Sequence, residues 1–375
     1  MKLKWICRLS RVIALIAIFA MVDRSIPSLT RYYYRHTYNP LNVKNGAEFE
    51  ECIRDATYEL IASESWGTRP MASCMSFSHF YYKKIFDGNN VIGYGEYGYL
   101  LHYAFLYAKK KNDQEMMSLI KDKFDKSWLK DLPIERIDQA AYGNVAIDLY
   151  LETHKPEYKS VADRFIAHLD SLYSNNGAIR YFSDSFDQDV DAIGLVPPFL
   201  FYYSKTFNNT KAQMLASHMV EDFVKWGTDP ITGIPCQAYD TKTHVKKRHV
   251  NWGRGTSWYL LGVRHLESID SVINERVELL DSTLIKMDTY LYPQYLGENG
   301  KPDMSVTIPI LHYLNSKGRM SLSKDELANI LSPYIDEEGI IRYGSPSISR
   351  PHEGVSVQMT NLMAQGLLLY YISEL

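Results

Sequence analysis

Apolar positions recur along most of this chain at the spacing of an α-helix. Between residues 137 and 149 an apolar side chain returns every four residues, and the run opened by Pro156 repeats that spacing as far as residue 172. The Asn-Asn-Gly turn at 175–177 closes the second run. Two consecutive amphipathic runs joined by a short connection predict a helical hairpin.

Comparable runs continue on both sides of this hairpin and are separated by loops rich in Gly, Asn, Asp and Pro. Strand-like alternation is confined to residues 178–182 and 339–343, so the sequence predicts an all-α protein. Pairs of runs recur about every 50 residues. Six hairpins then close into a double ring, a six-hairpin (α/α)6 barrel whose loops form a pocket at one rim, and an open helical solenoid is the alternative. The additional predicted helices are 48–63, 71–86, 94–110, 113–130, 190–206, 209–227, 252–267, 270–290, 303–316, 323–334 and 355–374.

The first 41 residues differ from the rest. Four basic residues before position 12 are followed by an uninterrupted apolar run, 12–22. This order is typical of a signal peptide, and without a small-x-small cleavage site it equally suits an uncleaved signal anchor. A buried first helix is the alternative. We therefore expect residues 1–41 to be an export segment with a polar tether, and residues 42–375 to be one exported barrel domain, in the cell envelope (periplasmic or membrane-anchored) or secreted.

Composition and net charge limit the classes of partner that the protein can bind. The chain has 375 residues, 46% of them hydrophobic and 23% charged, which is enough for a large core. A net charge of −3 gives no cationic field for nucleic acid, and the basic cluster 246–249 is typical of a solvated loop. The 29 tyrosines and 6 tryptophans suit sugar binding, although most rings should pack the core. The cysteines after the leader are too few for a disulfide framework. A single disulfide between Cys52 and Cys74 is compatible with the sequence.

Two aspartates stand at the starts of predicted helices. Asp191 opens the run DAIGLVPPFL, and Asp138 opens the hairpin at 137–172. Helix capping is the simplest role for either residue. Asp184, Asp187 and Asp189 crowd the approach to Asp191, and carboxylates in a partly dry pocket raise one another's pKa, which suits a general acid. The spacing of these acids does not complete a calcium loop, because position six lacks glycine and position twelve lacks glutamate.

The stretch NWGRGTSW, residues 251–258, places Trp252 and Trp258 on either side of Arg254. The glycines at 253 and 255 let the backbone approach a ligand at a helix entry. A guanidinium at this place suits the carboxylate of a uronic acid, and pairing of Arg254 with a nearby aspartate is equally compatible with the sequence.

These motifs together resemble a known family. The segments IDQAAYGNVAIDLYLETHKPEYKSVADRFIAHL, DVDAIGLVPPFLFYYSKTFNN, KWGTDPITGIPCQAYD and NWGRGTSWYLLGV are similar, in order and spacing, to glycoside hydrolase families 88 and 105, the unsaturated glucuronyl and rhamnogalacturonyl hydrolases. The resemblance covers about residues 115–267 and implies an (α/α)6 barrel.

The resemblance also implies a reaction, the hydration of the C4=C5 bond of a terminal unsaturated uronic acid in lyase-derived oligosaccharides. Asp191 is then the proton donor and Asp138 its partner carboxylate, both catalytic, and Arg254 and Trp258 line the sugar site together with Trp252. No metal and no organic cofactor is implied.

The chain departs from the family pattern at two places. Gln237 stands where many relatives have histidine, before Ala238-Tyr239-Asp240, so a substrate-binding contact at Gln237 and Tyr239 is altered, and Ser257 replaces the usual glycine before Trp258. These departures keep two alternatives open: an (α/α)-barrel enzyme acting on another, saturated cell-surface glycan, and a barrel that binds glycans without catalysis.

Overall fold

The structure is a computed structural model that describes residues 2–63, 95–130, 133–172, 179, 186–266, 270–345, 355 and 361–375. The chain divides into two compact units, one of residues 1–39 with 63–92 and one of residues 40–62 with 93–375. Helix α1 (Lys2–Thr37) lies in the first unit. Among the described residues no helix is both long enough and apolar enough to cross a membrane. The export role of residues 1–41 stays a prediction.

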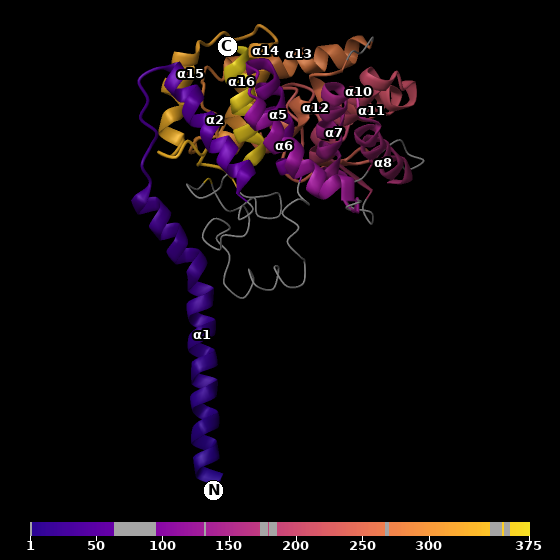
Figure 1. Cartoon of the computed structure of the whole chain (residues 1–375). Coiled ribbons are helices and arrows are strands. Elements are labelled where there is room, and N and C mark those ends of the chain that lie inside the picture. The colour runs from indigo at the N-terminus through magenta and orange to yellow at the C-terminus, as the bar shows by residue number, and fades with distance from the viewer. Residues whose placement is uncertain are drawn as a thin grey trace. The chain divides into compact units, whose positions relative to one another are not determined.

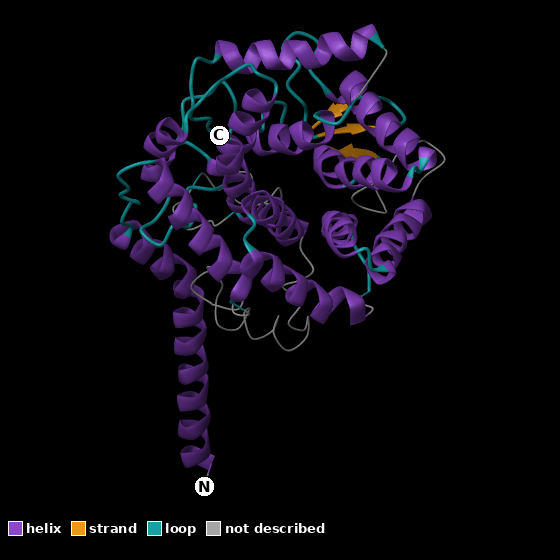
Figure 2. Cartoon of the chain, turned by 45° about the horizontal axis from the view of Figure 1, so that its top comes forward, coloured by secondary structure: helices purple, strands orange, loops and turns teal. Residues whose placement is uncertain are grey.

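The helices of the second unit are labelled in Figure 1, and the turned view in Figure 2 shows that the described ones form two sets, one inside the other. The inner set packs in the order α5, α7, α9 with α10, α12, α14, α16 and back to α5, so the ring is closed. The inner helices are α5 (Gly95–Lys111), α7 (Ala140–Thr153), α9 (Val190–Leu195), α10 (Pro197–Phe207), α12 (Gly253–Val263), α14 (Met304–Ser316) and α16 (Leu362–Glu374). The outer helices are α2 (Gly46–Ala62), α6 (Gln114–Ser127), α8 (Pro156–Leu172), α11 (Thr210–Asp222), α13 (Ser271–Lys286) and α15 (Lys324–Leu331).

Burial explains which helices are inner. In the outer helix α8 the buried residues are spaced as one face, at 158, 161, 162, 165 and 169, and the other side faces solvent. In the inner helix α12 all eleven residues are buried, because neighbours cover every side. From α6 onwards each outer helix is followed along the chain by an inner helix, or by the inner pair α9 and α10, so the inner helices run in the same direction and their N-termini gather at one rim.

Prolines divide one inner segment in two. The sequence predicted a single helix over 190–206, but α9 ends at Leu195 and α10 begins at Pro197. Neither Pro197 nor Pro198 has a backbone N–H to donate into the preceding turn, so the helical hydrogen bonding is interrupted there. The short helix α9 can therefore take its own direction, and it carries Asp191.

A small antiparallel sheet lies beside α9 and was not predicted. Its strands pair in the order β1 (Asp187–Asp189), β2 (Ala238–Asp240) and β3 (Lys246–Lys247) and appear together at one side of Figure 2. The register pairs Asp187 with Asp240 and Asp189 with Ala238, so Asp187, Asp189, Asp240 and Lys247 share one face.

Four short helical turns complete the described elements: η2 (Trp128–Lys130), η3 (Ile137–Gln139), η4 (Phe223–Gly227) and η5 (Ser332–Tyr334). The predicted helix at 71–86 and most of the strand-like piece at 178–182 lie outside the described residues. Strand pairing near 339–343 is a single bridge, Ile335 to Ile341. The helix predicted from 355 is described only from Leu362, where the Asn361 side chain caps it. Cys52 and Cys236 are free thiols, and Cys74 lies outside the described residues.

Candidate active site

Asp191 lies in the first turn of α9 and is partly exposed as a residue, but one oxygen of its carboxyl group is buried. Its Oδ2 atom has no hydrogen-bond partner among the described residues. Burial raises the pKa of Asp191 to about 7, with a further rise from the negative charge of Asp189. The charges of Arg254 and Arg248 oppose that rise. A carboxyl group with this pKa holds its proton near neutral pH, as a general acid must. Asp191 is not the N-cap of α9, because that position belongs to Asp189.

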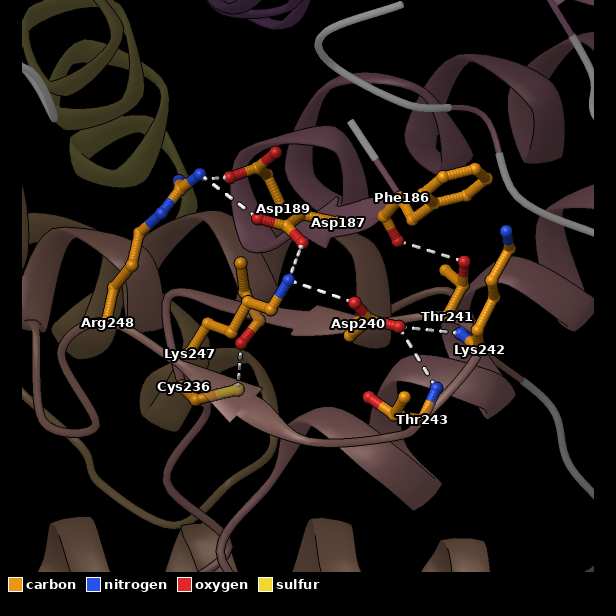
Figure 3. Close-up of polar contacts among 11 residues, drawn as sticks. Phe186, Asp187, Asp189, Cys236, Asp240, Thr241, Lys242, Thr243, Lys247 and Arg248 are labelled. Carbon is orange, nitrogen blue, oxygen red and sulfur yellow. Dashed lines mark hydrogen bonds and ion pairs between the residues drawn. The ribbon is translucent and has the colours of Figure 1, made fainter. Parts of the chain in front are cut away.

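The approach to Asp191 is a cluster of opposite charges on one face of the sheet, drawn in Figure 3. Arg248 donates from Nη1 to Oδ1 of Asp189 at 2.6 Å and lies 3.4 Å from Oδ2 of Asp187. Lys247 donates to Asp187 at 2.5 Å and to Asp240 at 3.0 Å. Two residues of the basic cluster 246–249 therefore pair with the acids of the sheet, while residues 246, 248 and 249 are solvent-exposed, as the sequence predicted for this cluster.

Asp138 lies in η3, which packs against α9, so the two predicted catalytic aspartates come from neighbouring elements. The side chain is buried, and its carboxylate accepts from Nε of Arg136 at 3.1 Å and lies 2.8 Å from Nη2 of the same residue. Burial raises the pKa of Asp138, and the Arg136 charge and a hydrogen bond from the Gly95 backbone work in the opposite direction. Asp138 is therefore a carboxylate paired with an arginine, on the element that packs against α9.

Arg254, in the first turn of α12, is held from two sides. It donates from Nη2 to Glu96 of α5 and from Nη1 to the carbonyl oxygen of Ser345 at 3.2 Å. The Ser345 N–H donates in turn to Asp303, the N-cap of α14, at 3.2 Å. The sequence left open whether Arg254 binds a ligand or pairs with an aspartate. Its partner is a glutamate 158 positions away, which sequence reasoning missed.

The two tryptophans of the predicted sugar site are buried. Trp258 is 4% exposed, and its ring centre lies 6.0 Å from that of Tyr99 in α5. A Cβ atom on Gly194 would lie 2.6 Å from the Trp258 carbonyl oxygen, so only glycine lets α9 approach α12 this closely. Trp252 is 3% exposed and is the N-cap residue of α12. In this structure both indoles support the helices that carry Asp191 and Arg254.

Gln237 and Tyr239 belong to the segment that leads into and forms β2. The Gln237 carbonyl oxygen accepts from the Val190 N–H at 2.9 Å, and the Gln237 N–H donates to the His249 carbonyl oxygen at 2.8 Å. These two bonds fix the start of α9 to the loop that carries Arg248. Tyr239 points to the other face of the sheet and packs on Phe223, with ring centres 5.6 Å apart.

The sequence therefore located the acids but not all of their partners. Asp138, Asp191 and Arg254 do come to one rim, where the inner helices begin. The missed residues are Glu96, Asp303 and the charge pair between Asp189 and Arg248. Within the described residues no group of three or more His, Cys, Asp or Glu side chains is arranged to hold a metal ion.

A closed double ring of helices, with carboxyl groups gathered at the rim where the inner helices start, is the architecture of a six-hairpin glycosidase. Residues 75–287 match the model of Glycosyl Hydrolase Family 88, which is more than half of the chain. The protein belongs to this family and is a glycoside hydrolase.

Solved structures support the fold. The chain is similar to a family 105 glycoside hydrolase of C. acetobutylicum, with 18% identity and a TM-score of 0.60 over 80% of this chain and 99% of that one. A possible family 105 member from Salmonella enterica gives 15% identity and a TM-score of 0.68 over 90% and 95%. A family 76 α-1,6-mannanase from Salegentibacter gives 12% and 0.60 over 88% and 99%. At these identities the likeness shows the fold alone. No curated protein matches the chain.

Proposed function

We propose that this glycoside hydrolase adds water across the C4=C5 double bond of a terminal unsaturated uronic acid and so releases the neighbouring sugar. One observation carries the proposal: Asp191 has a buried carboxyl oxygen without a partner and a pKa raised to about 7, while Asp138 and Asp189, on neighbouring elements, are each paired with an arginine. Hydration of a vinyl ether needs one proton donor, not a nucleophile and an acid on opposite sides of an anomeric carbon.

Asp191 performs both proton transfers in this reaction. Its carboxyl group donates a proton to C4, and the developing positive charge at C5 is shared with the ring oxygen. The resulting Asp191 carboxylate takes a proton from water as the water oxygen bonds to C5. The hemiketal at C5 then opens, and the former glycosidic bond breaks with release of the neighbouring sugar. One water molecule is consumed and Asp191 regains its proton.

Asp138 and Arg254 have supporting roles in the proposal. Asp138 accepts hydrogen bonds from sugar hydroxyls. Arg254 is engaged with Glu96 and Ser345, so it fixes the position of α12 and Trp258 relative to α5.

The test uses unsaturated disaccharides produced by polysaccharide lyases, with galacturonyl, glucuronyl and sulfated members, and follows the loss of ultraviolet absorbance of the conjugated alkene. Asp191→Asn should lower kcat by on the order of 10³-fold or more, because the amide cannot donate the proton. The matched control is Asp55→Asn, a change at an exposed aspartate of α2, which should turn over normally.

A saturated glycan panel runs in parallel. Turnover of saturated substrates with no loss of alkene absorbance on the unsaturated ones would assign the protein to a different glycan and reject the proposal. Circular dichroism of Asp191→Asn ensures that lost turnover reflects chemistry and not unfolding.

A further inference from the structure

Two carboxyl groups beside each other in this site each have an oxygen without a partner. Asp189, the last residue of β1, is 1% exposed; its Oδ1 accepts from Arg248, and its Oδ2 has no hydrogen-bond partner among the described residues. The Oδ2 of Asp191, two residues further on, has none either. Buried polar atoms are nearly always hydrogen-bonded, so two orphan carboxyl oxygens at one place require a reason.

The position of Asp189 is fixed from three directions. It is paired with Ala238 in the sheet register, its carboxylate is bonded to Arg248, and it directly precedes α9 as the N-cap residue. It makes no side-chain cap bond to α9, although aspartate is a preferred capping residue. The carboxylate is thus bonded to Arg248 instead of the helix amides, and its second oxygen is left without a partner.

The charged groups that act on Asp191 are few. Asp189 opposes loss of the Asp191 proton, and Arg254 from α12 and Arg248 from the loop after β3 favour it. Asp138 lies in η3, which also packs on α9. In η4, which contacts α9 as well, the cation is Lys225, whose ammonium lies over the Trp226 ring.

We propose that Asp189 and Arg248 form a positioning pair for the reaction, in which Asp189 holds an unpaired carboxylate oxygen beside Asp191 so that Asp191 keeps its proton, and Arg248 fixes that carboxylate in place. This inference deepens the proposed function and rests on it for the role of Asp191. Neither residue of the pair touches the reacting carbons. Asp189 acts by its charge and Arg248 by holding and partly offsetting that charge.

The two members of the pair should move the reaction's pH dependence in opposite directions. Asp189→Asn removes the negative charge and keeps the shape, so the alkaline limb of kcat/KM should shift down by about one pH unit. Arg248→Gln removes a cation, so the site retains protons to higher pH and the limb should shift up, even if the two aspartates then titrate as a coupled pair. Simple structural damage would not give opposite signs.

Asp55→Asn is the control. Asp55 is an exposed aspartate of the outer helix α2 that pairs with Arg54, so the change removes one carboxylate without altering Asp189 or Arg248. This variant should leave the alkaline limb in place. A limb that does not move in Asp189→Asn, or that moves the same way in both pair variants, overturns the inference.

A second measurement follows the titration of Asp191 through protein stability and needs no substrate. The full-length protein and Asp191→Asn are unfolded by urea between pH 4 and 9, and the difference in stability is plotted against pH. Because burial raises the folded pKa of Asp191 above its unfolded value, the wild type should lose stability relative to Asp191→Asn as pH rises from about 4, and the loss should level off near the folded pKa of about 7.

In the Asp189→Asn background the pH at which the stability difference levels off should be about one unit lower. The same levelling pH in both backgrounds would overturn the inference, whatever the enzyme turns over. If no unsaturated substrate reacts but the levelling pH shifts as expected, the proposed function fails and the pairing of Asp189 with Asp191 stands.

Discussion

The inner ring carries polar side chains at both of its ends, and the two ends differ in how these groups are hydrogen-bonded. At the rim where the inner helices begin, Asp189 and Asp191 each leave a carboxyl oxygen without a partner. Towards the helix C-termini lies a second set of polar residues, which we name the far-end cluster: His102, Asp148, Tyr202, Arg264, His312 and Glu374.

In the far-end cluster, both oxygens of Asp148 are engaged. Nδ1 of His102 lies 2.6 Å from Oδ2, and the Tyr202 hydroxyl donates to Oδ1 at 2.8 Å. Arg264 lies 3.4 Å from Nδ1 of His312, which must accept there, so the His312 proton is on Nε2 and faces Glu374 at 2.8 Å.

The comparison shows that buried charge alone does not mark a reactive group. A carboxylate whose oxygens are all bonded stabilises its ionised form and ties helices together. A carboxyl group with an orphan oxygen beside another acid gains little from ionising, so it keeps a proton that it can donate. Sequence motifs with acids occur at both ends, and the difference lies in the partners.

Among the variants that test this comparison, the largest expected effect is on catalysis at the rim that carries Asp191. Glu96→Gln removes the charge that balances Arg254, so the Arg254 cation acts more strongly on Asp191 and lowers its pKa. We expect kcat/KM at pH 7.5 to fall on the order of 30-fold, equivalent to about 2 kcal/mol. Steady-state kinetics across pH should show part of the loss recovered under acidic conditions. Glu115→Gln, an exposed residue paired with Arg54, is the control and should change nothing.

The next largest effect is on stability, at the far-end cluster, and the comparison between the two ends depends on it. Asp148→Ala leaves His102 and Tyr202 without their acceptor, so the free energy of unfolding should fall by about 2 kcal/mol, measured by urea denaturation with tryptophan fluorescence. At a temperature where the variant is folded, kcat should stay within about twofold of wild type. A large loss of kcat in a folded Asp148→Ala protein would mean that the far-end cluster takes part in the reaction.

The smallest effect concerns a single bond. Tyr202→Phe removes one hydrogen bond to the buried Asp148 and should lower the free energy of unfolding by about 1 kcal/mol. Tyr203→Phe removes the analogous bond to Asp163 of the outer helix α8, whose side chain is 43% exposed. Water can replace that bond, so this matched variant should cost clearly less. Equal losses would show that burial does not distinguish the two tyrosines.

Much of the fold was readable from the sequence, because its information is local. Helical spacing and caps predicted the hairpins, including the pair α7 and α8, and counting hairpins predicted the ring. The strand Asp187–Asp189 was not predictable in this way, since three polar residues carry no alternation. The break before Pro197 was missed because the apolar run continues across it, even though two prolines stand there.

The same distinction between local and long-range information holds for the site. Asp138 and Asp191 stand in segments whose order and spacing identify the family, so both could be named without a structure. Glu96 could not, because its contact with Arg254 joins residues far apart in the chain. Arg248 lay in a run of basic residues that looks like any exposed loop, and only the pairing of β1 with β2 and β3 brings it to Asp189.

The closure of the inner ring also has a consequence for how the protein is made. Helix α16 packs against α5, as the yellow and purple helices in Figure 1 show, although almost the whole barrel separates them in the sequence. During synthesis α5 leaves the ribosome early. The apolar side of α5 that packs on α16 stays exposed to solvent until α16 has been synthesised. Contacts between such distant segments form late, and uncovered apolar helices in the meantime favour aggregation. The nascent chain should therefore depend on chaperones until α16 has left the ribosome.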